Sequence, residues 1–207
     1  MLTGMEDKQT YGAAIRQGIY LIILTLIVFL FWRVSDVYKS ATVQEYGLFE
    51  TAQSVVIFLT ALSFGIQAAR NKTYRAILLL LCGLALAALV REQDAYLDKT
   101  IPYIGWTWCW LFPMTGLVIL IRQLRKETAT LTHFLSSHAF HMMMTAIIII
   151  IPIAQCLGHR SFLADLLGTP GIDSHLVRRI MEEPIELLGY IQILLASIET
   201  ALELRRK

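Results

Sequence analysis

The chain has 207 residues, of which 56% are hydrophobic and 16% are charged, and its formal net charge is +2. This apolar content exceeds that of a soluble domain, so the composition predicts one integral membrane domain covering residues 1–207. The small net charge, with no basic run interleaved with aromatic residues, argues against binding of nucleic acid. Three isolated cysteines without a CxxC pair indicate neither a disulfide framework nor a thiolate metal site.

Six apolar segments are long enough to cross a bilayer, whose core requires about 20 mostly apolar residues per helix. In the first, the apolar run from Ile19 to Trp32 is followed by Arg33 and Val34 and not by a signal-peptide cleavage motif, so we expect it to be retained. We therefore predict an all-α, polytopic protein with six transmembrane helices and, before the last of them, an amphipathic interfacial helix at about 173–183. The predicted spans are about 15–34, 46–69, 76–92, 105–123, 134–157 and 185–204.

The distribution of charge predicts how these spans are oriented. An even number of spans places both termini on one side, and eleven of the eighteen Lys and Arg residues fall on that side. Eleven of the sixteen Asp and Glu residues fall on the opposite side. Because basic residues are retained in cytoplasmic loops, we expect both termini in the cytoplasm, with the protein in a bacterial-type inner membrane or its equivalent.

Four stretches should meet on the acidic outer face. QEYGLFETAQ opens the second span, REQDAYLDK closes the third, CLGHR closes the fifth and SHLVRRIMEEPIELLGY leads into the sixth. Glu50 is expected about 9 Å inside its helix, where a lipid-facing carboxylate costs about 2–3 kcal/mol. It should therefore face the bundle interior, with Arg91 among its candidate partners. The candidate catalytic carboxylates are Glu50, Glu92, Asp94, Glu183 and Glu186.

These carboxylates, together with two nearby histidines, are also candidate metal ligands. An oxygen-rich site suits Ca²⁺, Mg²⁺ or Mn²⁺, and the addition of imidazole suits Zn²⁺. Without a metal, the same carboxylates can supply a general acid and a general base. The sequence contains no HExxH, GxSxG or P-loop pattern, so it identifies no particular reaction. The predicted ligands are His159, His175, Glu50, Glu92 and Asp94.

Part of this acidic cluster also fits a purely structural role. Glu183 and Glu186 flank Pro184 in the first turn of a predicted helix, where proline and acidic residues are favoured. Arg178 and Glu182 are four residues apart, as in an ion pair on a solvated helix. The same residues therefore support either a site or a stabilised interfacial helix.

A second polar group is expected near the cytoplasmic side. His141 in the fifth span and Glu199 in the sixth are predicted at matched depth, so they can form a hydrogen-bonded pair. His138 lies on the same helix face as His141. The alternative is an ordinary interhelical contact involving Ser137 or Gln67.

Three functions are compatible with this sequence. The first is a metal-assisted, membrane-embedded hydrolase or transferase that acts on a lipid or lipid-linked substrate from the outer face. The second is a proton- or cation-coupled transporter or channel that connects the outer acids to the inner His/Glu pair. The third is a non-catalytic membrane subunit whose charges bind partners in a larger complex.

Overall fold

The computed structural model describes residues 3–37, 48–93, 97, 109–124, 128–159 and 174–205. These residues are helical apart from short turns and contain no strand, which confirms the all-α prediction. The helices are α1 (Thr3–Val37), α2 (Leu48–Arg70), α3 (Arg75–Glu92), α5 (Leu111–Leu124), α6 (Thr128–Leu135), α7 (His138–Ile148), the π-helix η2 (Ile149–Ile153), α8 (Ala154–Gly158) and α10 (Ser174–Arg205).

Four helical stretches in the described part of the chain are long and apolar enough to cross a membrane. The helix α3 has 18 residues and α5 has 14, so at 1.5 Å per residue they extend about 27 Å and about 21 Å. This result supports the membrane class predicted from composition. The four stretches are Tyr11–Phe31, Phe49–Arg70, His138–Gly158 and Met181–Arg205.

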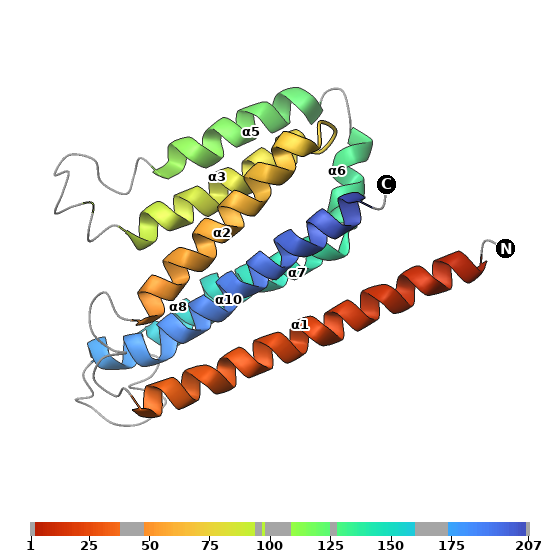
Figure 1. Ribbon diagram of the computed structural model, residues 1–207. Coiled ribbons are helices and arrows are strands. Elements are labelled where there is room, and N and C mark those ends of the chain that lie inside the picture. Colours follow the sequence, from red (N-terminus) through yellow and green to blue (C-terminus); the bar gives the residue numbers. More distant parts are fainter. Residues whose placement is uncertain are drawn as a thin grey trace.

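The helices form a bundle of rods, and each rod runs in the opposite direction to the one before it (Figure 1). In chain order the rods are α1, α2, α3, α5, the continuous stretch from α7 to α8, and α10. Both chain termini lie at one end of the bundle, which we call the terminal end; it also carries Arg70 and Arg205. The opposite end, where α3 ends at Glu92 and α8 ends at Gly158, is called the distal end. Polar residues from different rods can therefore meet at either end.

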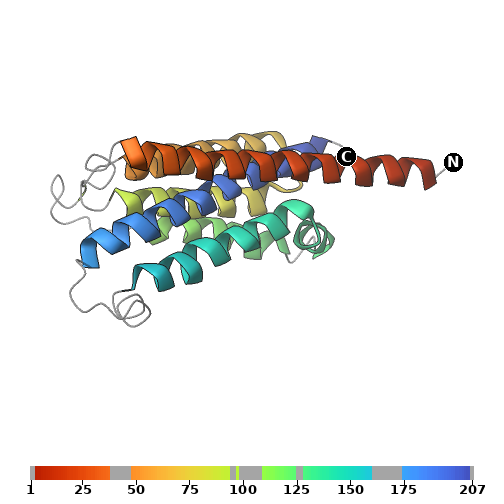
Figure 2. The same ribbon diagram turned by 90° about the horizontal axis from the view of Figure 1, so that it is seen from below.

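The helix α10 occupies the centre of this arrangement. It packs against α1, α2, α7, η2 and α8, and Figure 2 shows it between α1 and α2 on one side and α7 on the other. Its side chains Leu187, Leu195 and Ala196 are buried. By contrast, Tyr20 is the one buried residue of α1 among those whose burial the structure describes, and α1 packs mainly against α10. We infer that α1 depends on a small contact area to stay attached.

Two glycines allow α3 and α5 to approach closely. A Cβ at Gly83 would lie 2.6 Å from the carbonyl oxygen of Phe112, and one at Gly116 would lie 2.6 Å from the Cα of Leu80. Both obstacles are backbone atoms, which cannot rotate away. The close packing of α3 and α5 therefore requires residues without a Cβ at these two positions, and small residues are common where membrane helices meet.

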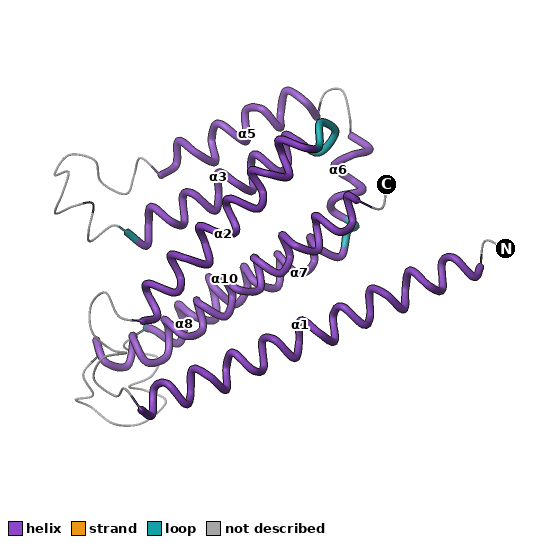
Figure 3. The backbone as a smooth tube through the Cα atoms, in the orientation of Figure 1, coloured by secondary structure: helices purple, strands orange, loops and turns teal. Residues whose placement is uncertain are grey.

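The predicted fifth span, 134–157, is interrupted rather than continuous. The chain turns at Ser136 and Ser137 between α6 and α7, where Figure 3 shows a short loop. The Ser137 hydroxyl accepts a hydrogen bond from the backbone N–H of Phe140, which caps α7. Further along, Pro152 lies inside the π-helix η2. Proline lacks the N–H that an α-helix needs there, and the wider turn accommodates this.

The predicted interfacial helix at 173–183 is continuous with the last span. Both belong to α10, and Pro184 lies inside it. From the sequence, Pro184 is expected in the first turn of a new helix. Instead, one continuous helix begins at the distal end, where it carries acidic residues, and extends through the centre of the bundle.

Candidate functional site

The distal end contains a network of polar side chains from three helices, which we call the distal cluster. The helix α3 contributes its last two residues, α8 contributes one amide, and α10 contributes three residues spaced four apart on one face. Its members are Arg91, Glu92, Gln155, Glu182, Glu186 and Tyr190.

Arg91 lies at the centre of this network. Its Nη2 donates hydrogen bonds to Oε1 of Glu92 at 3.0 Å and to Oε1 of Glu186 at 3.4 Å. The Tyr190 hydroxyl, 3.4 Å from the same nitrogen, donates to Oε1 of Glu92 at 2.9 Å. One guanidinium therefore holds carboxylates that belong to two different helices.

Gln155 connects two carboxylates on the other side of the cluster. Its Nε2 donates to Oε1 of Glu182 at 2.9 Å and to Oε1 of Glu186 at 3.1 Å. Gln155 follows the π-helix, and each residue inserted into a helix shifts the later side chains by about 100° around its axis. We infer that the wide turn around Pro152 directs this amide toward α10.

The cluster is buried unequally. Glu182 and Glu186 are 4% and 6% exposed, whereas the side chain of Arg91 is 49% exposed. With three carboxylates and one guanidinium, its formal charge is −2 when all are ionised. The arrangement provides carboxylates for proton transfer and an accessible cation that can bind an anionic group.

The structure brings together two of the five predicted catalytic residues. Glu92 and Glu186 both contact Arg91. Glu183 is half-buried, and its backbone carbonyl accepts a hydrogen bond from Gln53 Nε2 at 2.9 Å. Glu50 lies half-buried in the first turn of α2, one turn before Gln53. A role for Glu50 and Glu183 in the same site stays a prediction.

Three of the five predicted metal ligands, Glu50, Glu92 and His159, have side chains that the structure describes. Asp94 and the side chain of His175 lie outside the described residues. His159 is exposed and follows the last residue of α8. Among the residues that the structure describes, no group of three or more His, Cys, Asp or Glu side chains is arranged to hold a metal ion.

Sequence reasoning missed two members of the distal cluster and gave Glu182 a structural role. The spacing of Glu182, Glu186 and Tyr190 was available as a signal, because residues four apart share a helix face. Gln155 gave no such signal. Its role depends on a π-helix that periodicity does not reveal.

A second group of polar residues, the terminal cluster, joins α1 to α10. The Arg16 Nε donates to both carboxylate oxygens of Glu199, at 3.1 Å and 2.9 Å, and the Tyr20 hydroxyl donates to Oε2 at 2.9 Å. The predicted partner, His141, is exposed, and its Nδ1 lies 2.7 Å from the carbonyl oxygen of Ser137. Glu199 thus bonds to α1 where the sequence suggested α7.

A mainly apolar cavity lies inside the bundle and reaches Tyr190 of the distal cluster. The cavity, of about 110 Å³, lies between α2, α3, α7 and α10, and most of its lining is aliphatic or aromatic. Tyr190 and Thr60 are the residues with hydroxyl groups along it. The other residues that line this cavity are apolar.

No protein-family model, curated protein or solved structure matches the chain. The function is therefore inferred from the residues of the site.

Proposed function

We propose that the protein is a membrane-embedded hydrolase or transferase that acts on a lipid or lipid-linked substrate at the distal cluster. In this proposal six rods cross the membrane, both termini are cytoplasmic, and the distal cluster faces the outer side of a bacterial-type inner membrane. The alternation of rod directions and the excess of basic residues at the terminal end support this orientation.

The proposed six spans require two helices that are shorter than the other four. At about 27 Å, α3 approaches the bilayer core of about 30 Å, and its terminal charges extend toward the headgroups. The helix α5 is shorter still, at about 21 Å, and it packs along α3. A short apolar helix can be accommodated by local thinning of the bilayer.

One observation carries the functional proposal: carboxylates from α3 and α10 converge on one half-exposed guanidinium. Buried charges at a membrane boundary are costly, and such groups usually mark a function. Arg91 is suited to bind the phosphate of a lipid substrate because guanidinium and phosphate match in charge and geometry. Glu186 or Glu92 then acts as the base that accepts a proton from an attacking water or hydroxyl.

The proposal is tested by following lipid turnover in reconstituted protein. The full chain is placed in liposomes of total bacterial polar lipids, and products are identified by mass spectrometry over time. We expect one lipid class to be consumed by the wild type and its rate to fall by about 10²-fold or more in Glu186→Gln and Glu92→Gln. Glu203→Gln at the terminal end is the matched control and should keep the wild-type rate.

A second set of reactions tests the predicted divalent metal. If Zn²⁺, Mg²⁺, Mn²⁺ or Ca²⁺ takes part, chelation abolishes turnover and one of these ions restores it. Turnover that survives chelation assigns the reaction to the carboxylates alone. If the wild type consumes no lipid class under either condition, or if Glu186→Gln has no effect on turnover, the proposal is wrong.

The alternative functions have less support from the described residues. A transporter needs polar groups across the midplane, where the cavity lining is mainly apolar. A docking subunit is compatible with the exposed apolar surface of α1, but the same surface also suits lipid. Ion flux in proteoliposomes that is abolished by Glu186→Gln would favour a transporter over the enzyme.

A further inference from the structure

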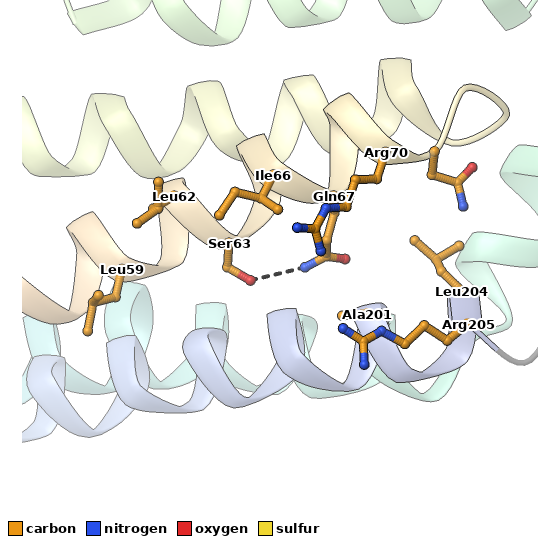
Figure 4. A pocket seen from close by; sticks show the side chains of 10 residues that line it. Leu59, Leu62, Ser63, Ile66, Gln67, Arg70, Ala201, Leu204 and Arg205 are labelled. Carbon is orange, nitrogen blue, oxygen red and sulfur yellow. Dashed lines mark hydrogen bonds between the residues drawn. The ribbon is translucent and has the colours of Figure 1, made fainter.

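A groove at the terminal end, between α2 and α10, is independent of the distal cluster. Its volume is about 500 Å³, within the range of about 300–1,000 Å³ typical of ligand sites. Leu59, Leu62 and Ile66 of α2 form an apolar wall, and Ala201 and Leu204 of α10 lie opposite. Figure 4 shows these residues on the two facing helices.

The groove has the length of one membrane leaflet. Leu59 and Asn71 mark its two ends along this part of the chain, and at 1.5 Å per residue they lie about 18 Å apart along the axis of α2. Half of a bilayer core of about 30 Å is about 15 Å. The groove therefore extends from near the proposed midplane to the headgroup level, as the chain of a lipid does.

Two arginines form the mouth of the groove. Arg70 and Arg205 belong to the last turns of α2 and α10, and their side chains extend into the space between the helices (Figure 4). Neither guanidinium has an ion-pair partner among the residues that the structure describes. Helix C-termini favour basic residues, which accounts for an arginine on each helix. It does not account for two unpaired cations that share one apolar groove.

A buried acceptor without a partner lies one turn deeper than Arg70. The Gln67 Nε2 donates to Ser63 Oγ at 3.0 Å and to the carbonyl oxygen of Ser197 at 2.9 Å. Its Oε1 has no hydrogen-bond partner, although Gln67 is 9% exposed and lines the groove. An unpaired buried acceptor costs about 1–3 kcal/mol, and a ligand hydroxyl would satisfy it.

We propose that this groove binds a single-chain phospholipid with an anionic headgroup, of the lysophosphatidate class. Its phosphate pairs with Arg70 and Arg205, and its acyl chain lies along Leu59 and Ile66. The free glycerol hydroxyl, which lies just inside the phosphate in such a lipid, donates to Gln67 Oε1. The position of this acceptor favours a lipid with one chain and one free glycerol hydroxyl over a diacyl lipid, which lacks that hydroxyl.

The proposal is tested by native mass spectrometry of the purified full chain in detergent. The probes are lysophosphatidic acid, lysophosphatidylcholine with the same chain, and a lysophosphatidic acid whose glycerol hydroxyl is methylated. We expect the wild type to prefer the first probe to each of the others by about tenfold or more, because the choline lipid loses the net negative headgroup charge and the methylated lipid leaves the buried Gln67 Oε1 without a donor. Gln67→Leu should abolish the preference over the methylated lipid and keep the preference over the choline lipid.

The arginines are tested with a matched control at the same end of the bundle. The double variant Arg70→Gln/Arg205→Gln should lose the preference for the anionic lipid, and Arg75→Gln, which removes an exposed charge outside the groove, should keep it. Equal binding of all three probes by the wild type would overturn the proposal. An equal loss of preference in Arg75→Gln would do so too, because it would indicate general attraction to basic charge. These outcomes do not depend on lipid turnover at the distal cluster.

Discussion

The ion pair between Arg16 and Glu199 is expected to hold α1 on the bundle. Glu199 is 1% exposed, and its carboxylate receives hydrogen bonds from Arg16 and from Tyr20. The variant Arg16→Met removes the guanidinium and keeps much of the apolar chain. It leaves a buried carboxylate with the Tyr20 hydroxyl as its donor from α1.

The structure sets the expected size of this effect. Removing one partner of a buried ion pair costs about 3–5 kcal/mol, and the bond retained from Tyr20 places Arg16→Met at about 3 kcal/mol. For a chain of this length, 1 kcal/mol corresponds to about 2–4 °C, so the melting temperature should fall by about 6–12 °C. Because Tyr20 is the one buried residue of α1 among those whose burial the structure describes, few other contacts can compensate.

The assay is thermal unfolding of the purified chain in one detergent, followed by fluorescence and by size-exclusion chromatography. Arg122→Met, which removes an exposed arginine from α5, serves as the control and should change the melting temperature by about 1–2 °C at most. The double variant Arg16→Met/Glu199→Met should be more stable than Arg16→Met, since it removes the unpaired charge. If the double variant is less stable than Arg16→Met, or if the control loses as much as Arg16→Met, the reasoning is refuted.

Three further predictions concern packing, capping and the distal cluster. Gly83→Ala should lower the free energy of unfolding by about 1–3 kcal/mol, measured by chemical denaturation, because the new Cβ would meet backbone atoms of Phe112. Gly65→Ala is the control and should cost little, since the atom nearest to its Cβ is 3.7 Å away. Ser137→Ala should cost about 1 kcal/mol by removing the cap of α7, and Ser136→Ala, in the same turn, should cost clearly less in the same measurement. Tyr190→Phe removes the hydrogen bond donated to Glu92 and the longer one accepted from Arg91, and it should cost about 1–2 kcal/mol of stability, with a slower lipid turnover than the wild type. A stability loss without any change in turnover would indicate a structural hydroxyl.

Local periodicity was least reliable where proline occurs inside a rod. Pro184 fits the first turn of a helix, yet α10 continues through it from Ser174. Pro152 lies inside a π-helix, and Gln155, which follows it, contacts Glu182 of α10. In both cases packing against neighbouring rods outweighs the local preference, as it commonly does for helix termini.

The sequence by itself determined the membrane class and the helical rods. Long apolar runs must satisfy their backbone hydrogen bonds internally, and a helix does this without any neighbour. The placement of acidic residues toward one end of α3 and α10 could likewise be predicted, as Glu92 and Glu186 show. These properties depend on residues close together in the chain.

Only the tertiary structure decided which polar groups meet. Arg16 and Glu199 are 183 residues apart in sequence, and Arg91 and Glu186 are 95 apart. Hydropathy specifies how deep each residue lies, but any polar residue at the same depth is then an equally good partner. The choice of Arg16 over His141 for Glu199, and of Gln155 for Glu186, follows from the rotation of each rod about its own axis, which close packing of side chains sets.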